Sequence, residues 1–156
     1  MAIVTHVFSQ IYLHFNWHTL YDRPVLHGPL ELYVQNFIRN RCRQTRGVFF
    51  EEIGGTDTHT HLATRCEPFV TPADLIGEVK GSASYEANKH FKRKALDWQR
   101  GYGVVSFSKR QLPWIREYIR NQRRHHAAGT INEALEMHGE LEEQLPKAGS
   151  KPAKEG

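Results

Sequence analysis

The sequence predicts an α+β fold in which one antiparallel sheet of four or five strands carries helices on one face, in a ferredoxin-like arrangement. One observation is the order of segments, because stretches rich in β-branched and aromatic residues alternate with stretches of helical periodicity as β-α-β-β-α-β-α. A second is the length, since 156 residues suffice for one domain with a sizeable core. A third is the composition, because 39% hydrophobic and 24% charged residues exclude disordered and fibrous chains.

The first half of the chain is predicted to form a strand, a helix and a β-hairpin. Residues 3–15 are rich in β-branched and aromatic side chains, which favours a strand. Residues 29–46 place apolar side chains near helical spacing and end in arginines followed by Gly47, which is a helix-stop signal. Residues 47–55 and 58–66 are short strand-like segments that meet at a glycine-containing turn, so we expect a hairpin.

The second half is predicted to continue as helix, strand and helix. Thr71 stands before a proline, which is typical of a helix start, and this helix is expected to run to about Phe91. Residues 101–108 have the composition of a strand. Residues 109–126 follow as a helix that Gly129 ends.

Charge divides the chain into three parts. Residues 1–128 hold 18 basic and 11 acidic side chains, residues 129–146 hold five glutamates and no Lys or Arg, and residues 147–156 are again basic. We therefore expect a basic domain over the first part, an acidic amphipathic C-terminal helix over the second and a disordered tail over the third. A basic domain suggests a polyanionic partner, although solubility alone would also account for the charge.

The sequence favours a cytoplasmic protein without a membrane partner. Its first 17 residues contain no Lys or Arg, so the basic start of a secretory signal is missing. No apolar run reaches about 18 residues, the length that a membrane-spanning helix needs. Two cysteines, Cys42 and Cys66, are too few for a disulfide framework, which fits a reducing compartment.

Two histidines separated by one residue lie on the third predicted strand. Alternate side chains of a strand project from the same face, so the imidazoles of His59 and His61 would stand about 6–7 Å apart at the backbone and could share one divalent cation. The alternative is a pair of exposed polar residues on a half-buried strand. A third ligand is needed before this pair indicates a metal site.

A tyrosine and a glutamine share one face of the last predicted domain helix. Tyr118 and Gln122 are four residues apart and are therefore neighbours on a helix. A metal held by His59 and His61 would satisfy the carbonyl oxygen of Gln122, and Tyr118 would be a candidate phosphoryl acceptor. The alternative is a packed aromatic ring with a solvated hydroxyl. Basic side chains that could hold phosphates lie on this helix and after the second helix, and the candidate DNA contacts are Arg116, Arg120, Arg123, Arg124, Lys92 and Arg93.

Five further histidines receive weaker interpretations. His125 and His126 are expected at the surface end of the last domain helix, where a cation suits the helix dipole, and a phosphate contact is the alternative. His6, His14 and His18 alternate along the first strand and could share a face with the site, which makes them weak candidate ligands. None of the five is expected to be central to the metal site.

Four stretches, taken in order, resemble the HUH nucleases and most specifically the single-tyrosine transposases of the insertion-sequence-200-like type, which include the REP-associated tyrosine transposases. These stretches are YDRPVL at 21–26, HTHL at 59–62, WQRGYGVVSFS at 98–108 and YIRNQRRHH at 118–126. The resemblance covers about residues 5–128. The chain departs from the family pattern at Thr60, where a bulky apolar residue is usual between the two histidines.

The resemblance implies a metal-dependent single-strand DNA endonuclease and strand transferase, which forms a 5′-phosphotyrosine intermediate at hairpin-containing DNA ends. It implies Tyr118 as the nucleophile, and His59, His61 and Gln122 as ligands of Mg²⁺ or Mn²⁺. It also implies a homodimer, and a bacterial protein that associates with the nucleoid when bound to DNA.

Two other functions stay open at the level of sequence. One is a catalytically inactive or domesticated relative that binds hairpin DNA, although the presence of Tyr118, His59, His61 and Gln122 argues against decay. The other is a metal-dependent hydrolase of small phosphoesters, in which the tyrosine is only structural. Preference for hairpin DNA over small esters would separate these classes.

Overall fold

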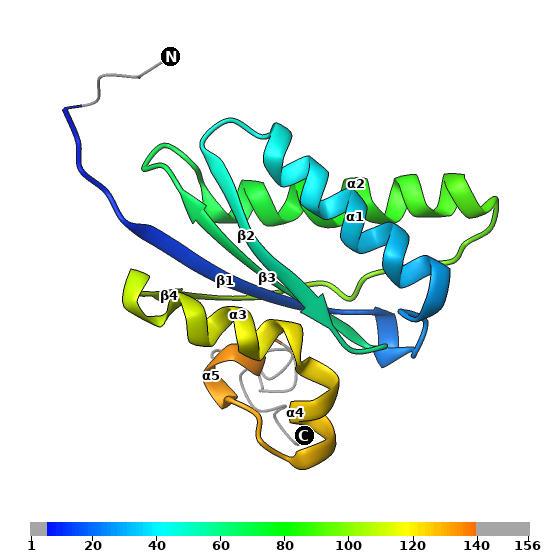
Figure 1. Cartoon of the computed structure of the whole chain (residues 1–156). Helices are drawn as coiled ribbons and strands as arrows, with labels where there is room; N and C mark the ends of the chain where they lie inside the picture. Colours follow the sequence, from blue (N-terminus) through cyan, green and yellow to red (C-terminus); the bar gives the residue numbers. More distant parts are fainter. Residues whose placement is uncertain (1–5, 140–156) are drawn as a thin grey trace, which may run out of the picture.

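An antiparallel sheet in the strand order β2-β3-β1-β4 forms the centre of the computed structural model, which describes residues 6–139 (Figure 1). The strands are β1 (Ile11–His18), β2 (Val48–Gly55), β3 (His59–Cys66) and β4 (Gly103–Phe107). The predicted hairpin is confirmed, because β2 and β3 are adjacent in the sequence and pair antiparallel. The first strand lies further along the chain than the predicted 3–15, because its partner β3 ends at Cys66, opposite Ile11.

The helices follow the predicted order, with one difference in the last domain helix. They are α1 (Gly28–Gln44), α2 (Pro72–Phe91), α3 (Leu112–Arg120), α4 (Gln122–Ala128) and α5 (Glu133–Glu136), with short 3-10 turns at Leu20–Asp22 and Lys109–Gln111. The helix predicted over 109–126 is divided at Asn121, whose backbone leaves helical geometry at φ −109° and ψ 33°. The side-chain amide of Asn121 donates to the carbonyl oxygen of Glu117 at 3.1 Å, a local hydrogen bond of the kind that competes with regular helix.

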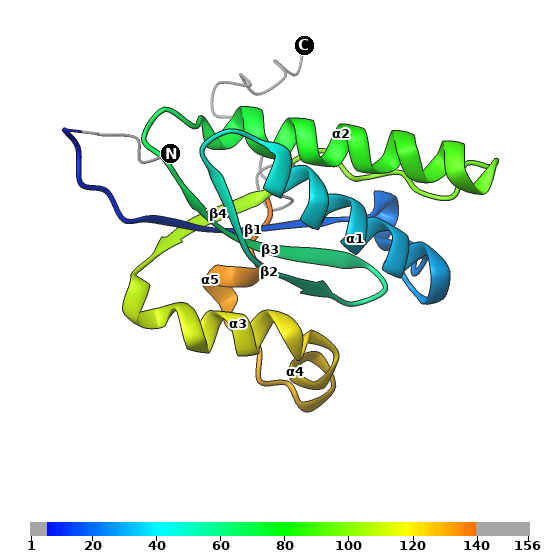
Figure 2. The same cartoon turned by 45° about the horizontal axis from the view of Figure 1, so that its top comes forward.

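Helices cover both faces of the sheet, so the prediction of helices on one face was wrong in this respect (Figure 2). α1 and α2 enclose a core that includes Phe15, Trp17 and Leu62 on one side. α3 and α5 enclose a second, smaller core on the other side, with Ala63 and Leu135 among its members. The reason is that β1 and β3 are buried on both faces, and polar side chains on the second face concealed that burial from the sequence pattern.

The strand register gathers polar side chains on the second face. His18 pairs with His59 across the β1–β3 ladder, and Asn16 pairs with His61. His14 lies on the same face of β1 because it is two residues before Asn16. Histidines and an asparagine therefore form a polar floor beneath α3, α4 and α5.

The close approach of α3 to this floor depends on a glycine in β2. A Cβ atom built at Gly54 would lie 2.2 Å from the backbone oxygen of Ile119, which is well inside contact distance. Gly54 pairs with His61 in the adjacent strand, so the helix descends next to that histidine. This contact sets the height of the helix above the histidine pair.

The C-terminal segment returns to the sheet within the described residues. The acidic helix predicted over 129–146 is helical there only at Glu133–Glu136, and Leu135 is buried in the second core. The tail predicted over 147–156 lies outside the described part of the chain. Among the described residues, no helix is long and apolar enough to cross a membrane.

Candidate active site

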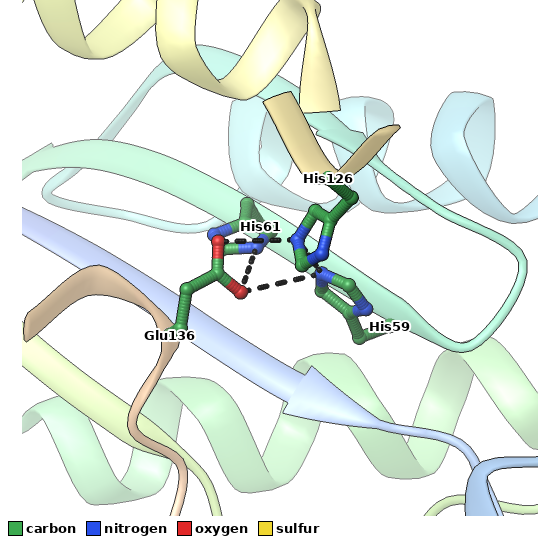
Figure 3. Close-up of side chains that lie close together, drawn as sticks. All are labelled: His59, His61, His126 and Glu136. Carbon is green, nitrogen blue, oxygen red and sulfur yellow. Dashed lines mark hydrogen bonds and ion pairs between the residues drawn. The ribbon is translucent and has the colours of Figure 1, made fainter. Parts of the chain in front are cut away.

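Three histidines and a glutamate converge on one point between the sheet and the C-terminal helices (Figure 3). His59 and His61 come from β3, His126 from α4 and Glu136 from α5. Each side chain offers one ligand atom, and these atoms all lie within 4.8 Å of one another. Three elements of the fold therefore meet in a donor set that is typical of divalent metal sites.

Hydrogen bonds on the outer side of the two β3 histidines orient their rings. His59 Nδ1 lies 2.9 Å from Thr56 Oγ1 and 3.0 Å from Thr58 Oγ1. His61 Nδ1 lies 2.8 Å from His14 Nε2. Both rings therefore direct Nε2 into the cluster, as expected for histidines whose other nitrogen has an orienting partner.

His14 contributes to the site from behind the ligands. The sequence suggested it only as a weak candidate ligand, and its ring contacts His61 without reaching the point of convergence. Burial lowers the pKa of His14 well below its usual value, so the ring is neutral near pH 7 and can accept a hydrogen bond from His61. His14 is thus a positioning residue for His61.

Gln122 lies where the sequence placed it, with its carbonyl oxygen toward the histidines. Gln122 Nε2 donates to the backbone oxygen of Tyr118 at 3.1 Å, which fixes the orientation of the amide. Its Oε1 is then 3.3 Å from His59 Nε2 and 3.2 Å from His126 Nε2. The structure therefore brings the three expected ligands, His59, His61 and Gln122, to one location.

Tyr118 lies over the histidines of its own chain. Its ring meets that of His61 edge-on, with 6.0 Å between the ring centroids. Its hydroxyl donates to the carboxylate of Glu136 and accepts a hydrogen bond from the backbone N–H of Asn132 at 3.0 Å. Burial, together with the hydrogen bond to Glu136, raises the pKa of Tyr118 to about 12. The side chain is only 1% exposed, and its hydroxyl lies against Asn132 and Glu136 of the C-terminal segment.

The electrostatics of the cluster suit a cation. Burial lowers the pKa of His61 to about 4, so this imidazole is neutral at physiological pH. Burial opposes ionisation of Glu136 as well, but its contacts with His59 and His61 outweigh burial and hold the pKa of that carboxyl well below its usual range. The group is therefore a carboxylate surrounded by imidazoles.

One nitrogen in the cluster supplies a direct test of metal fit. His61 Nε2 is fully buried and has no hydrogen-bond partner, although it lies 3.4 Å from Glu136 Oε2. A buried polar atom without a hydrogen bond is costly, and a metal ion would satisfy its lone pair. The residues present therefore fit a divalent cation.

The arginines around Tyr118 are paired with glutamates in this structure. The pairs are Arg116 with Glu51, Arg120 with Glu52, Arg123 with Glu31 and Arg124 with Glu117. Lys92 and Arg93 lie just after α2, where Arg93 lines a pocket of about 270 Å³ together with residues at the start of α1. Arg123 also reaches the segment before α1, because it donates a hydrogen bond to the backbone oxygen of Leu26 at 3.1 Å.

Two residues of the cluster were missed by sequence reasoning. His126 was expected at the surface, yet it follows Gln122 by four residues, and that spacing was an available signal for a shared helix face. Glu136 carried no local signal, because its place depends on the chain folding back after Gly129. The exposed ring of Trp114, which stacks on Tyr118 with 5.4 Å between centroids, borders the same site.

Comparison with known proteins gives a family and several similar structures. The family model described as "Transposase IS200 like" matches residues 7–122. No curated protein matches the sequence. A candidate transposase from Deinococcus radiodurans R1 has a similar structure, with a TM-score of 0.62 at 20% identity over 78% of this chain and 98% of that one. A REP-associated tyrosine transposase bound to a REP hairpin is also similar, with a TM-score of 0.56 at 11% identity over 81% and 74% of the two chains.

Proposed function

This chain belongs to the family of IS200-like transposases, and from that premise we propose that it is a metal-dependent single-strand DNA endonuclease and strand transferase. Tyr118 is the nucleophile in this proposal. Its oxygen attacks phosphorus, the bond between phosphorus and the 3′ oxygen breaks, and the products are a 5′-phosphotyrosine link and a free 3′-hydroxyl. Attack by that or another 3′-hydroxyl reverses the step and joins strands without ATP.

The proposed metal ligands are His59, His61 and Gln122, with Mg²⁺ or Mn²⁺ as the ion. When bound, the ion would polarise the scissile phosphate and stabilise its developing charge. His14 and the threonines beside His59 keep the two imidazoles pointing inward. Gln122 is kept in place by its hydrogen bond to the backbone of Tyr118, so ligand and nucleophile move together.

The observation that carries the proposal is the location of the Glu136 carboxylate. One of its oxygens accepts a hydrogen bond from the Tyr118 hydroxyl, and the other lies 3.4 Å from Nε2 of both His59 and His61. An anion therefore already touches the nucleophile on one side and the metal ligands on the other. A scissile phosphate, which is also an anion, has to make the same two sets of contacts during the reaction.

Hairpin-containing single-stranded DNA is the proposed substrate. The basic charge of the domain supports a polyanion, and a structurally similar transposase was solved with a REP hairpin. We propose that the arginines beside Tyr118 exchange their glutamate partners for DNA phosphates, and that Lys92 and Arg93 contact a second part of the DNA. The exposed side chain of Trp114 can stack a base next to the nucleophile.

A homodimer and a location at bacterial DNA complete the proposal. Both follow from the family resemblance, and the dimer is not needed to complete the site because Tyr118 lies over His61 of its own chain. Light scattering at several protein concentrations, with and without hairpin DNA, tests the dimer. A monomer under all of these conditions would contradict it.

The experiment uses labelled single-stranded DNA from the sequences that flank the gene, with Mn²⁺ or with EDTA. We expect a Mn²⁺-dependent covalent protein–DNA band on a denaturing gel, which mass spectrometry maps to Tyr118. Tyr118→Phe should abolish this band and preserve DNA binding, whereas the matched control Tyr85→Phe, at an exposed tyrosine of α2, should preserve both. A Mn²⁺-dependent band that persists in Tyr118→Phe would refute the assignment of the nucleophile.

The second candidate is a catalytically inactive or domesticated protein that binds hairpin DNA. One observation favours it, which is that Tyr118 is 1% exposed and already hydrogen-bonded to Glu136. Hairpin binding without any covalent adduct, across several flanking hairpins and in variants that release the C-terminal segment, would establish this alternative.

A further inference from the structure

We propose that His59, His61, His126 and Glu136 form a four-coordinate site for a zinc-like transition metal, and that the ion fastens residues 132–138, here named the C-terminal strap, to the sheet. The inference deepens the proposed function, on which it rests because the two sites share His59 and His61. The four-residue site differs from the metal site of the proposed function in its other ligands, in the class of metal and in its effect on the chain. The expected set of His59, His61 and Gln122 involves no part of the strap.

The donor atoms favour a transition metal over Mg²⁺. Three imidazole nitrogens and one carboxylate oxygen meet at the point of convergence. Imidazole is a preferred ligand of Zn²⁺ and neighbouring transition metals, whereas Mg²⁺ selects oxygen ligands and retains several waters. Replacing the amide oxygen of Gln122 with His126 and Glu136 therefore changes the metal preference of the site.

Three separations between donor atoms lie close to the edges of a tetrahedron. With Oε2 as the ligand atom of Glu136, they are 3.1 Å (His59 Nε2 to His126 Nε2) and twice 3.4 Å (Glu136 Oε2 to His59 Nε2 and to His61 Nε2). Tetrahedral zinc with ligands at about 2.05 Å has edges of about 3.3 Å. An octahedral magnesium site with ligands at about 2.05 Å has edges of about 2.9 Å. The two edges to Glu136 Oε2 therefore have the tetrahedral length, and the edge between His59 and His126 lies between the two values.

The strap has its own docking contacts, so Glu136 does not reach the histidines by chance. The side-chain amide of Asn16 donates to the backbone oxygens of both Leu135 and Met137, at 2.9 and 2.8 Å, and thereby holds the residues on either side of Glu136. Gly103 makes room for this contact, because a Cβ atom there would lie 1.7 Å from the backbone oxygen of Met137. The sheet is thus shaped to receive the strap.

Outer hydrogen bonds complete the ligand shell. His59 and His61 are oriented by threonines and by His14, and Glu136 is held by the hydroxyl of Tyr118. Such outer partners are usual for metal ligands and are unnecessary for solvated side chains. A metal ion would bind the lone pair of His61 Nε2, which has no hydrogen-bond partner. The ion would also stand between this lone pair and the carboxylate of Glu136, which lies 3.4 Å away.

Metal binding and strap docking are therefore linked. An ion that needs Glu136 binds more tightly to the docked form than to a form in which the strap has left, so each event strengthens the other. In the docked form Tyr118 is covered, and the metal would stabilise that covered state.

The test measures metal binding directly on the full chain. Co²⁺ serves as a spectroscopic probe, because four-coordinate Co²⁺ absorbs visible light strongly and six-coordinate Co²⁺ absorbs weakly. Titration calorimetry gives the Zn²⁺ affinity of the wild type and of Glu136→Gln and His126→Ala. We expect intense Co²⁺ bands in the wild type, and a loss of Zn²⁺ affinity of about 100-fold or more in each variant.

Matched controls separate ligation from general effects of charge or of histidine content. Glu133→Gln removes a carboxylate from the same short helix, and His90→Ala removes an exposed histidine at the end of α2. Both should bind Zn²⁺ as the wild type does. Gly103→Ala keeps every ligand but obstructs the strap, so it should reduce Zn²⁺ affinity and remove the slowing of amide exchange that Zn²⁺ causes in residues 132–138.

Two results would overturn the inference. One is weak, six-coordinate Co²⁺ absorption in the wild type, and the other is unchanged Zn²⁺ affinity in Glu136→Gln. The covalent-adduct assay in Mn²⁺ distinguishes this failure from failure of the proposed function. An adduct together with unchanged Zn²⁺ binding in Glu136→Gln refutes only the four-residue site, whereas Glu136-dependent Zn²⁺ binding without any adduct refutes only the nuclease.

Discussion

The hydroxyl of Tyr118 donates a hydrogen bond to the carboxylate of Glu136, a residue 18 positions further along the chain. This single contact joins the proposed nucleophile to the segment that covers it. The same carboxylate touches His59 and His61, so Glu136 connects nucleophile, metal ligands and strap. In this structure the Tyr118 hydroxyl is therefore engaged by the strap.

Release of the strap should expose the nucleophile. In Gly103→Ala, the new Cβ atom collides with the backbone oxygen of Met137 and weakens docking. Overpacking of this kind costs about 1–3 kcal/mol, which corresponds to a rise of roughly 5- to 150-fold in the rate of adduct formation if docking limits that rate. Time courses of the Mn²⁺-dependent adduct measure the effect. Gly77→Ala in α2 is the control, because a Cβ atom at Gly77 meets nothing within 4 Å. An equal rate of adduct formation in the two variants would contradict a covering role.

The height of α3 above the sheet should be sensitive to Gly54. A Cβ atom there would lie 2.2 Å from the backbone oxygen of Ile119, so Gly54→Ala has to push the helix outward. We expect the free energy of unfolding to fall by about 1–3 kcal/mol and adduct formation to fall with it, since Tyr118 and Gln122 move away from His61. Urea unfolding followed by circular dichroism measures the first effect. Gly77→Ala should instead be neutral or stabilising by up to about 1 kcal/mol, and a Gly54→Ala protein as stable as the wild type would contradict the packing argument.

His14 should affect metal affinity without being a ligand. His14→Phe fills the same buried space but removes the acceptor that orients His61. Loss of an outer-shell partner typically reduces metal affinity 10- to 100-fold, and we expect about this reduction for Zn²⁺ and Mn²⁺ by calorimetry. The spectrum of bound Co²⁺ should retain its wild-type form, because the ligands are intact. His6→Phe, at an exposed histidine before β1, is the control. Equal metal affinities for the two variants would show that the His14–His61 contact is not important for binding.

Trp114 should contribute to DNA binding rather than to the reaction. Its ring is 49% exposed and stacks on Tyr118, which leaves its outer face available to a base. Stacking of one base on an aromatic side chain is worth about 1–3 kcal/mol, so Trp114→Ala should weaken binding of single-stranded DNA by the corresponding factor. Fluorescence anisotropy with a labelled oligonucleotide measures this change. Tyr85→Ala removes another exposed aromatic side chain, from α2, and should bind as the wild type does.

Much of the fold could be read from the sequence because its signals are local. The alternation of strand-like and helical segments predicted the element order, and the turn after β2 predicted the hairpin. The helix break at Asn121 and the burial of both sheet faces were not predicted, because both depend on contacts that no single segment reveals. The polar side chains of His14 and Asn16 made β1 resemble a strand with one solvated face.

The sequence by itself determined the residues of the expected site. The spacing of His59 and His61 on a strand and of Tyr118 and Gln122 on a helix depends only on local geometry, so these pairs could be identified without a structure. Only the tertiary structure decided that His126 and Glu136 join them and that His14 stands behind His61. Glu136 reaches the site because Gly103 and Asn16 dock a segment from the far end of the chain, and such long-range packing leaves no periodic signal in the sequence.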